Sequence, residues 1–221
     1  SSFGPGLLGE LARQAQAHRE GGADDPHERE RNIALVNRAC RVALDYFTQL
    51  KDHLSVLAPT SPARYAFDGR TTVSALPMKQ FRVVHKSLVH HNGVEHFEGV
   101  SFAWQAGRGD KLTLVKDFPP DLERLRARLA FAGIRAHEAP VHDRATGRQH
   151  GTSLEFAADV NAVVRLIPVH DRGVVRLVCQ NLDALERIEG ELPAFAIRAK
   201  ELDELSKWIL GRPSEILKIM Q

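Results

Sequence analysis

The chain has 221 residues, enough for one domain with an appendage or at most two small domains. Its 30 basic and 28 acidic residues leave a net charge of +2 and are interspersed, so we do not expect a nucleic-acid partner. No apolar run reaches the roughly 18 residues that a membrane-spanning helix requires, so we do not expect a membrane partner either.

The two cysteines, Cys40 and Cys179, favour a reducing compartment. Neither has a CxxC partner, and each falls within an apolar pattern, Cys40 on a predicted helix and Cys179 in a predicted strand. We therefore interpret both as small buried hydrophobic residues and expect a cytoplasmic protein.

Residues 1–24 are predicted to form a flexible N-terminal segment. Glycine crowds its start, and Gly21-Gly22 separates it from the following helix. A short amphipathic pattern places Leu7 and Leu11 on one side. Because an isolated helix of this length is marginal in water, we expect the segment to need a surface on the same chain or on a partner.

Residues 25–58 are predicted to form one long helix. Asp25 is a good N-cap because its carboxylate can accept hydrogen bonds from the free N–H groups of the first turn. Pro26 suits the first helical position, where its missing N–H costs nothing. No glycine or proline follows until Pro59, which predicts that the helix ends near Ala58.

The apolar side chains of this helix recur at steps of three and four residues, as in a coiled-coil seam. The row consists of Ile33, Val36, Cys40, Ala43, Phe47, Leu50, Leu54 and Leu57. One interpretation is that the row packs across the sheet of its own domain. The other is that it also pairs with a second subunit, in which case Phe47, Leu50 and Leu54 are the candidate partner-binding residues.

Residues 59–221 are predicted to form an antiparallel α+β domain that packs with the long helix. Strand-like segments joined by tight turns indicate hairpins at 81–105 and 162–180, which imply antiparallel pairing. Helices are predicted at 121–132, 183–189 and 200–210. The predicted fold class is therefore α+β, with a curved, mainly antiparallel sheet built from β-hairpins, helices on one face and a long N-terminal helix.

The hairpin at residues 81–105 carries the one constellation that suits a metal ion. If Asn92-Gly93 is a two-residue turn, the expected cross-strand pairs are Val83 with Phe102, His85 with Val100, Ser87 with Glu98 and Val89 with His96. These residues would share one face, where His85, His96 and Glu98 could converge. Imidazole and carboxylate groups suit a divalent metal, and a histidine near a carboxylate suits general-base catalysis.

Two functions from different classes follow from these patterns. The first is a non-enzymatic, cytoplasmic assembly or protein-interaction module that acts as a homo-oligomer or as a subunit of a larger complex. It rests on the seam of the long helix and on the separate N-terminal segment. The alternative is a metal-dependent or small-ligand-binding enzyme with its site on the His/Ser/Glu face of hairpin 81–105. No nucleophile elbow, Walker loop, dinucleotide fingerprint or HExxH motif decides between them.

Overall fold

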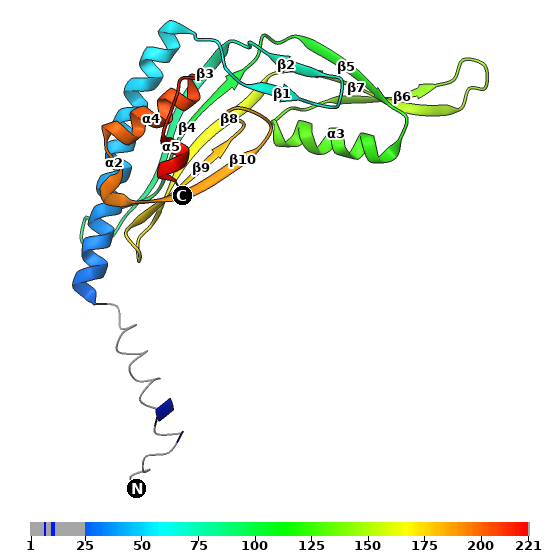
Figure 1. Cartoon of the computed structure of the whole chain (residues 1–221). Helices are drawn as coiled ribbons and strands as arrows, with labels where there is room; N and C mark the ends of the chain where they lie inside the picture. The colour runs from blue at the N-terminus through cyan, green and yellow to red at the C-terminus, as the bar shows by residue number, and fades with distance from the viewer. Residues whose placement is uncertain (1–6, 8–9, 12–24, 221) are drawn as a thin grey trace.

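The structure is a computed structural model that describes Leu7, Glu10, Leu11 and residues 25–220 (Figure 1). Apart from those three residues, the segment expected to be flexible, 1–24, lies outside the described part of the chain. Within the described part, no helix combines the length and the apolar character needed to cross a membrane.

The long helix α2 spans Pro26–Leu57 and is capped as the sequence predicts. The Asp25 carboxylate accepts a hydrogen bond from the His27 N–H at 3.0 Å. At the other end Ala58 adopts a left-handed conformation, and its N–H donates to the Leu54 carbonyl. Both ends are therefore set by local interactions, and the predicted boundaries are confirmed.

Five antiparallel strands form the main sheet, in the order β10-β9-β8-β4-β3. They are β3 (Met78–Val89), β4 (Glu95–Ala106), β8 (Val160–Val169), β9 (Val174–Gln180) and β10 (Arg187–Pro193). Along β4, Val100, Phe102 and Trp104 are buried, whereas the residues between them keep some exposure. One face of the sheet is therefore packed against a core, and the other face remains open.

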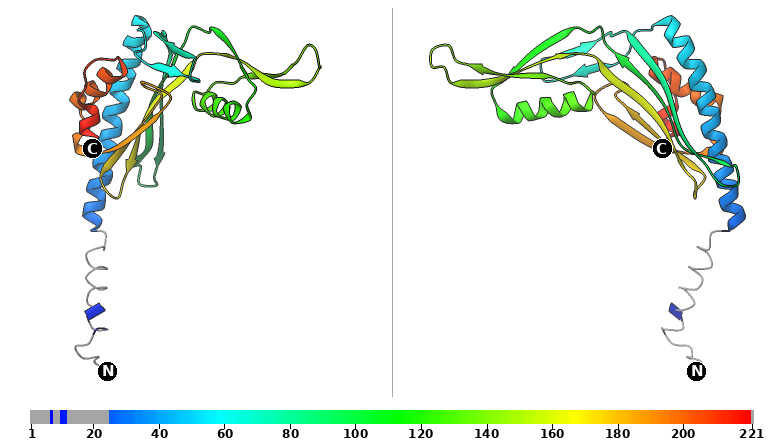
Figure 2. Two further views of the ribbon diagram at one scale, coloured as in Figure 1. Left: turned by 45° about the vertical axis from the view of Figure 1, so that its right-hand side comes forward. Right: turned by 180° about the vertical axis from the view of Figure 1, so that it is seen from behind.

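Three helices cover the packed face of the main sheet (Figure 1 and Figure 2). They are α2, α4 (Ala199–Ile209) and α5 (Ile216–Ile219), and a short 3-10 helix, η1 (Ala194–Ala196), precedes α4. Phe47 of α2 stacks on Phe102 of β4, with 5.5 Å between the ring centroids. The long helix thus supplies the centre of this core.

A second, smaller core lies beside the main sheet. Its three-stranded sheet has the order β5-β7-β6, from β5 (Lys111–Lys116), β7 (Gln149–Ala157) and β6 (His137–His142). The hairpin of β1 (Arg64–Ala66) and β2 (Thr72–Ser74) and the helix α3 (Pro119–Phe131) complete it. The large side chains that it buries include Tyr65, Phe67, Leu125, Leu129, Leu154 and Phe156. Figure 1 shows α3 on the side of the molecule away from α2.

The α+β class, the antiparallel pairing and the long N-terminal helix are confirmed. The strands divide among three sheets, of five, three and two strands. The short helix predicted at residues 183–189 is wrong, because Arg187–Pro193 forms the edge strand β10. In this strand Ile188 and Leu192 are less exposed than their neighbours, which is the two-residue period of a strand.

Candidate functional site

The apolar row of α2 packs inside the chain. Phe47 has no exposed surface, Leu54 is buried, and Leu50 is partly buried against the same core. Because Phe47 stacks on Phe102, this row faces the main sheet. The partner contact expected of Phe47, Leu50 and Leu54 therefore finds almost no free surface on Phe47 and Leu54, and only part of Leu50.

The loop between β3 and β4 has three residues, whereas the sequence predicted two. The N–H of His90 donates to the Val94 carbonyl at 3.0 Å, and the Gly93 N–H donates to the His90 carbonyl at 2.8 Å. Within this loop only Gly93 adopts a positive φ. This is the arrangement of a three-residue loop that ends in a left-handed glycine, so Asn92 keeps an ordinary conformation.

The longer loop shifts the pairing at the hairpin tip by one residue, and a β-bulge then cancels the shift. At the tip Ser87 pairs with Phe97, but nearer the base His85 pairs with Val100. The extra residue between these pairs is Glu98, which has no partner on β3. The predicted register is therefore confirmed from Arg82 to Lys86 and wrong at the tip, and a second irregularity lies between Lys79 and Arg82 at the base.

The bulge separates the three residues that the sequence groups as metal ligands. His85 stays on the face that α2 covers, with its ring centroid 6.1 Å from that of Phe97. His96 takes the opposite face, and Glu98 pairs with Lys86 at 2.5 Å. Among the residues that the structure describes, no three His, Cys, Asp or Glu side chains are grouped to hold a metal. His85, His96 and Glu98 do not converge, and we assign no metal to them.

His96 instead joins two other histidines on the open side of the sheet. Its ring centroid lies 4.1 Å from that of His90 and 5.8 Å from that of His170. Burial, followed by the nearby charges of His90 and His170, lowers the pKa of His96. Burial also lowers the pKa of His170, against the opposing effects of a Phe97 backbone hydrogen bond and of Asp171. Both rings therefore resist protonation in the folded chain.

The two cysteines are buried and free, Cys40 in α2 and Cys179 in β9. Burial raises the pKa of each thiol to about 12. Because the thiolate is the reactive form, neither cysteine is suited to act as a nucleophile. Both are small core residues, as the sequence predicts.

The strand β3 is an open edge of the main sheet. It pairs with β4 on one side, and on the other side its first residue is covered, since the Met78 N–H donates to the Pro59 carbonyl at 2.8 Å. In the described chain no strand pairs with the outer side of residues 81–89. The exposed fractions of the apolar side chains there are 59% for Val84, 52% for Leu88 and 71% for Val89.

The opposite edge of the sheet is protected in ways that β3 is not. The edge strand β10 has 7 residues, whereas β3 has 12. The exposed side chains of β10 include Arg187, Glu189 and Glu191, and the strand ends at Pro193. Short length and proline are two of the usual protections of an edge against added strands, and β3 has neither. Of these two edges, β3 is therefore the one suited to pairing.

Positive charge on β3 is not matched by negative charge on the same strand. Lys79, Arg82 and Lys86 lie on it, and it has no Asp or Glu. Lys79 and Lys86 each have a carboxylate partner elsewhere, whereas Arg82 has no ion-pair partner in the part of the chain that the structure describes. Since alternate residues share a face, Arg82 and Lys86 flank Val84 on the open face.

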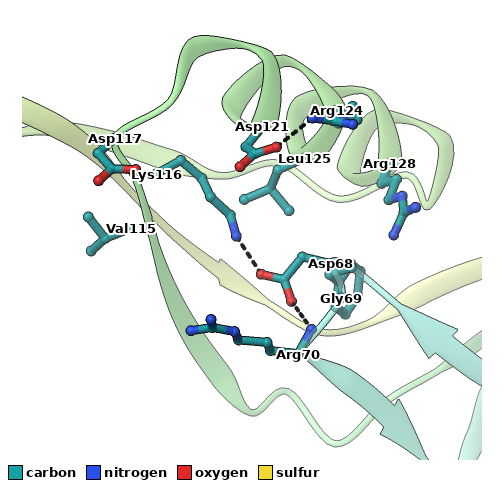
Figure 3. Close-up of a pocket in the computed structure, with 11 residues that line it drawn as sticks. Asp68, Gly69, Arg70, Val115, Lys116, Asp117, Asp121, Arg124, Leu125 and Arg128 are labelled. Carbon is teal, nitrogen blue, oxygen red and sulfur yellow. Dashed lines mark hydrogen bonds and ion pairs between the residues drawn. The ribbon is translucent and has the colours of Figure 1, made fainter.

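A second candidate site is a cleft of about 620 Å³ between the β1–β2 turn, the end of β5 and α3 (Figure 3). Asp68 organises one wall, because its carboxylate accepts from the Arg70 and Thr71 N–H groups at 2.8 and 2.7 Å. It also accepts from Lys116 at 2.6 Å. Partial burial acts to raise the pKa of Asp68, but these hydrogen bonds outweigh it and hold that pKa well below its usual range.

Three arginines line this cleft. Arg124 pairs with Asp121 at 2.6 Å, and Arg128 donates to the Ala66 carbonyl at 3.1 Å. In Figure 3 the Arg70 side chain makes no hydrogen bond or ion pair with the other residues drawn. The lining includes no histidine, cysteine, serine or threonine. The cleft therefore offers guanidinium groups that suit an anion, beside the carboxylates of Asp68, Asp117 and Asp121, and it has no hydroxyl, thiol or imidazole side chain.

Comparisons of the chain with protein-family models, with curated proteins and with solved structures found no significant match. Function must therefore be inferred from the β3 edge and the cleft, neither of which the sequence indicated. The cleft joins the turn at Asp68 to a helix far along the chain, with no local pattern to reveal it. For the edge one clue was available, since residues 78–89 hold three cations and no carboxylate.

Proposed function

We propose that this chain is a non-enzymatic protein-interaction module that binds an extended segment of another protein along the outer edge of β3. The supporting observation is the open edge at residues 81–89, with its exposed apolar side chains. A bound segment would pair with the backbone groups that point away from β4 and would add one strand to the main sheet. Its own apolar side chains would cover Val84 and Leu88.

The charge of β3 favours a different protein over a second copy of this chain. If two copies of β3 paired antiparallel with their packed faces aligned, Arg82 and Lys86 of both copies would share one face. Like charges opposed across a strand pair are destabilising, and neither strand has a carboxylate to compensate. We therefore propose a subunit of a larger complex rather than a homo-oligomer. The two free, buried cysteines support a cytoplasmic setting.

Binding of a small anionic molecule is a second candidate function, supported by the cleft in Figure 3. Its volume of about 620 Å³ is in the range of small-molecule sites. Arg70 would meet the ligand without first giving up a partner in that cleft, whereas Arg124 would compete with Asp121. This candidate replaces the site on the hairpin, where His85, His96 and Glu98 do not converge.

Hydrogen–deuterium exchange with a neutral strand-forming peptide tests the main proposal. The probe is Thr-Gln-Thr-Val-Thr-Gln-Thr-Val-Thr, and it should slow amide exchange in residues 81–89. Val84→Lys should abolish this protection, because it replaces the apolar contact on which the neutral peptide depends with a third positive charge between Arg82 and Lys86. The matched control is Val115→Lys, since Val115 is a similarly exposed valine on β5.

The peptide experiment also has a control for the mode of binding. The same peptide with proline at its centre should give no protection, because proline cannot donate to a strand ladder. Absence of protection at millimolar concentration, both by the neutral peptide and by a version with glutamate in place of glutamine, would contradict the proposal. So would equal protection of the Val84→Lys protein.

A further inference from the structure

We infer that the segment bound by β3 is acidic at alternate positions, in the pattern acidic, any, apolar, any, acidic. This inference rests on the proposed function, since it names the chemistry of the partner that the β3 edge selects. It is carried by the order of side chains along the open face of this edge.

Side chains of two kinds alternate along that face. Reading every second residue of β3, they are Arg82, Val84, Lys86 and Leu88. A residue opposite one of these on an added strand would have its Cβ about 5 Å away, close enough for direct contact. Acidic groups are therefore required opposite Arg82 and Lys86, and apolar groups opposite Val84 and Leu88. The pattern reads the same in either strand direction.

The two cations are available to a partner. Arg82 has no ion-pair partner in the described part of the chain, and its guanidinium can bind a carboxylate through two parallel hydrogen bonds. Lys86 pairs with Glu98, but the lysine side chain is 75% exposed. Exposed ion pairs of this kind contribute little, so Lys86 can exchange Glu98 for a carboxylate on the partner.

An acidic protein segment suits this edge better than a nucleic acid does. Sequence-tolerant binding of single strands relies on aromatic side chains that stack on the bases. Within residues 81–89 the one phenylalanine, tyrosine or tryptophan is Phe81, which stacks on Phe102 and is partly buried against the main core. A phosphate backbone would neutralise Arg82 but would leave Val84 and Leu88 in contact with water. An alternating acidic and apolar strand meets both requirements.

Three peptides that differ only in charge test the inference on the full chain. They are the neutral peptide above and the same sequence with glutamate or with lysine in place of glutamine. Since each opposite-charge pair across strands strengthens pairing by about twofold, within a range of roughly 1.4- to fivefold, we expect the two pairs together to make the glutamate peptide bind roughly fivefold tighter than the neutral one. The lysine peptide should bind more weakly than either. The preference should shrink as salt is added, because salt screens exposed charges.

Two arginine variants locate the effect. Arg82→Gln should reduce the preference for the glutamate peptide to about twofold and leave binding of the neutral peptide unchanged. Arg176→Gln is the matched control, since Arg176 is exposed on β9, with β8 and β4 between it and β3, and it also forms no ion pair among the described residues.

The outcomes separate the inference from the proposed function. Equal affinity for the glutamate and neutral peptides would overturn the acidic partner and leave strand addition in place. A loss of preference in Arg176→Gln equal to that in Arg82→Gln would overturn the assignment to the β3 edge. Protection of residues 81–89 by none of the three peptides would overturn both the inference and the proposed function.

Discussion

Replacing Phe47 with alanine should destabilise the fold strongly without changing the mass of the protein in solution. Phe47 has no exposed surface and stacks on Phe102 in the main core. Truncating a buried phenylalanine lowers the free energy of unfolding by about 3–5 kcal/mol, through lost burial and the cavity left behind. In a chain of this length each kcal/mol lowers the melting temperature by about 2–4 °C. We therefore expect a fall of roughly 6–20 °C.

Chemical denaturation followed by circular dichroism measures the free energy, and light scattering measures the mass. Val56→Ala is the matched control, because Val56 lies on the same helix and is 86% exposed. Its free energy of unfolding should change by no more than about 0.5 kcal/mol. A Phe47→Ala protein with a smaller mass and unchanged stability would refute this reasoning, because it would place the apolar row of α2 between subunits.

The cleft and the hairpin tip give two further predictions. Inorganic phosphate should bind to the cleft in titration calorimetry, and Arg70→Gln should weaken this binding. Arg144→Gln, a change in the exposed turn between β6 and β7, should leave the affinity for phosphate unchanged. Absence of phosphate binding would argue against an anion site. The lowered pKa values of His96 and His170 mean that folding favours the neutral form of both rings. The stability that these two residues contribute is therefore complete above 6.5, the pKa of histidine in the unfolded chain, and is lost as the pH falls below that value. Amide exchange at the tip, corrected for intrinsic rates, should therefore speed up from about pH 7 to pH 5, and an undiminished response in His170→Gln would speak against this origin.

Interactions between near neighbours made part of the fold predictable. Asp25 and Pro26 mark the start of α2 because a cap acts within a single turn. The pairing in the middle of the β3–β4 hairpin was predictable because Val83 and Phe102 follow a two-residue alternation that must present one face to one core.

The hairpin tip was not predictable, because two loop types place the same demand on Gly93. A two-residue loop requires positive φ at both Asn92 and Gly93, whereas a three-residue loop requires it at Gly93 alone. Both fit the sequence, and they differ by one residue in register. That difference decides whether His96 lies with His85 or on the opposite face, so the metal hypothesis depended on it.

The partner of the α2 row was not predictable either, because steps of three and four residues suit a helix on a sheet as well as a helix on another helix. What decides between them is Phe102, which lies far along the chain and stacks on Phe47. The β3 edge was not predictable for the same reason, since a strand can be identified as an edge only when the order of all five strands is known.

The residues that hold this fold together are separate from those proposed to select its partner. Phe47 and its neighbours in the main core are buried, so changes there alter the free energy of unfolding. Arg82, Val84 and Lys86 are exposed on the open edge, where substitutions usually change stability by less than about 0.5 kcal/mol. The edge can therefore change in charge and pattern while the core stays intact. A loss of peptide binding in edge variants with unchanged melting temperature is the result that such a separation requires.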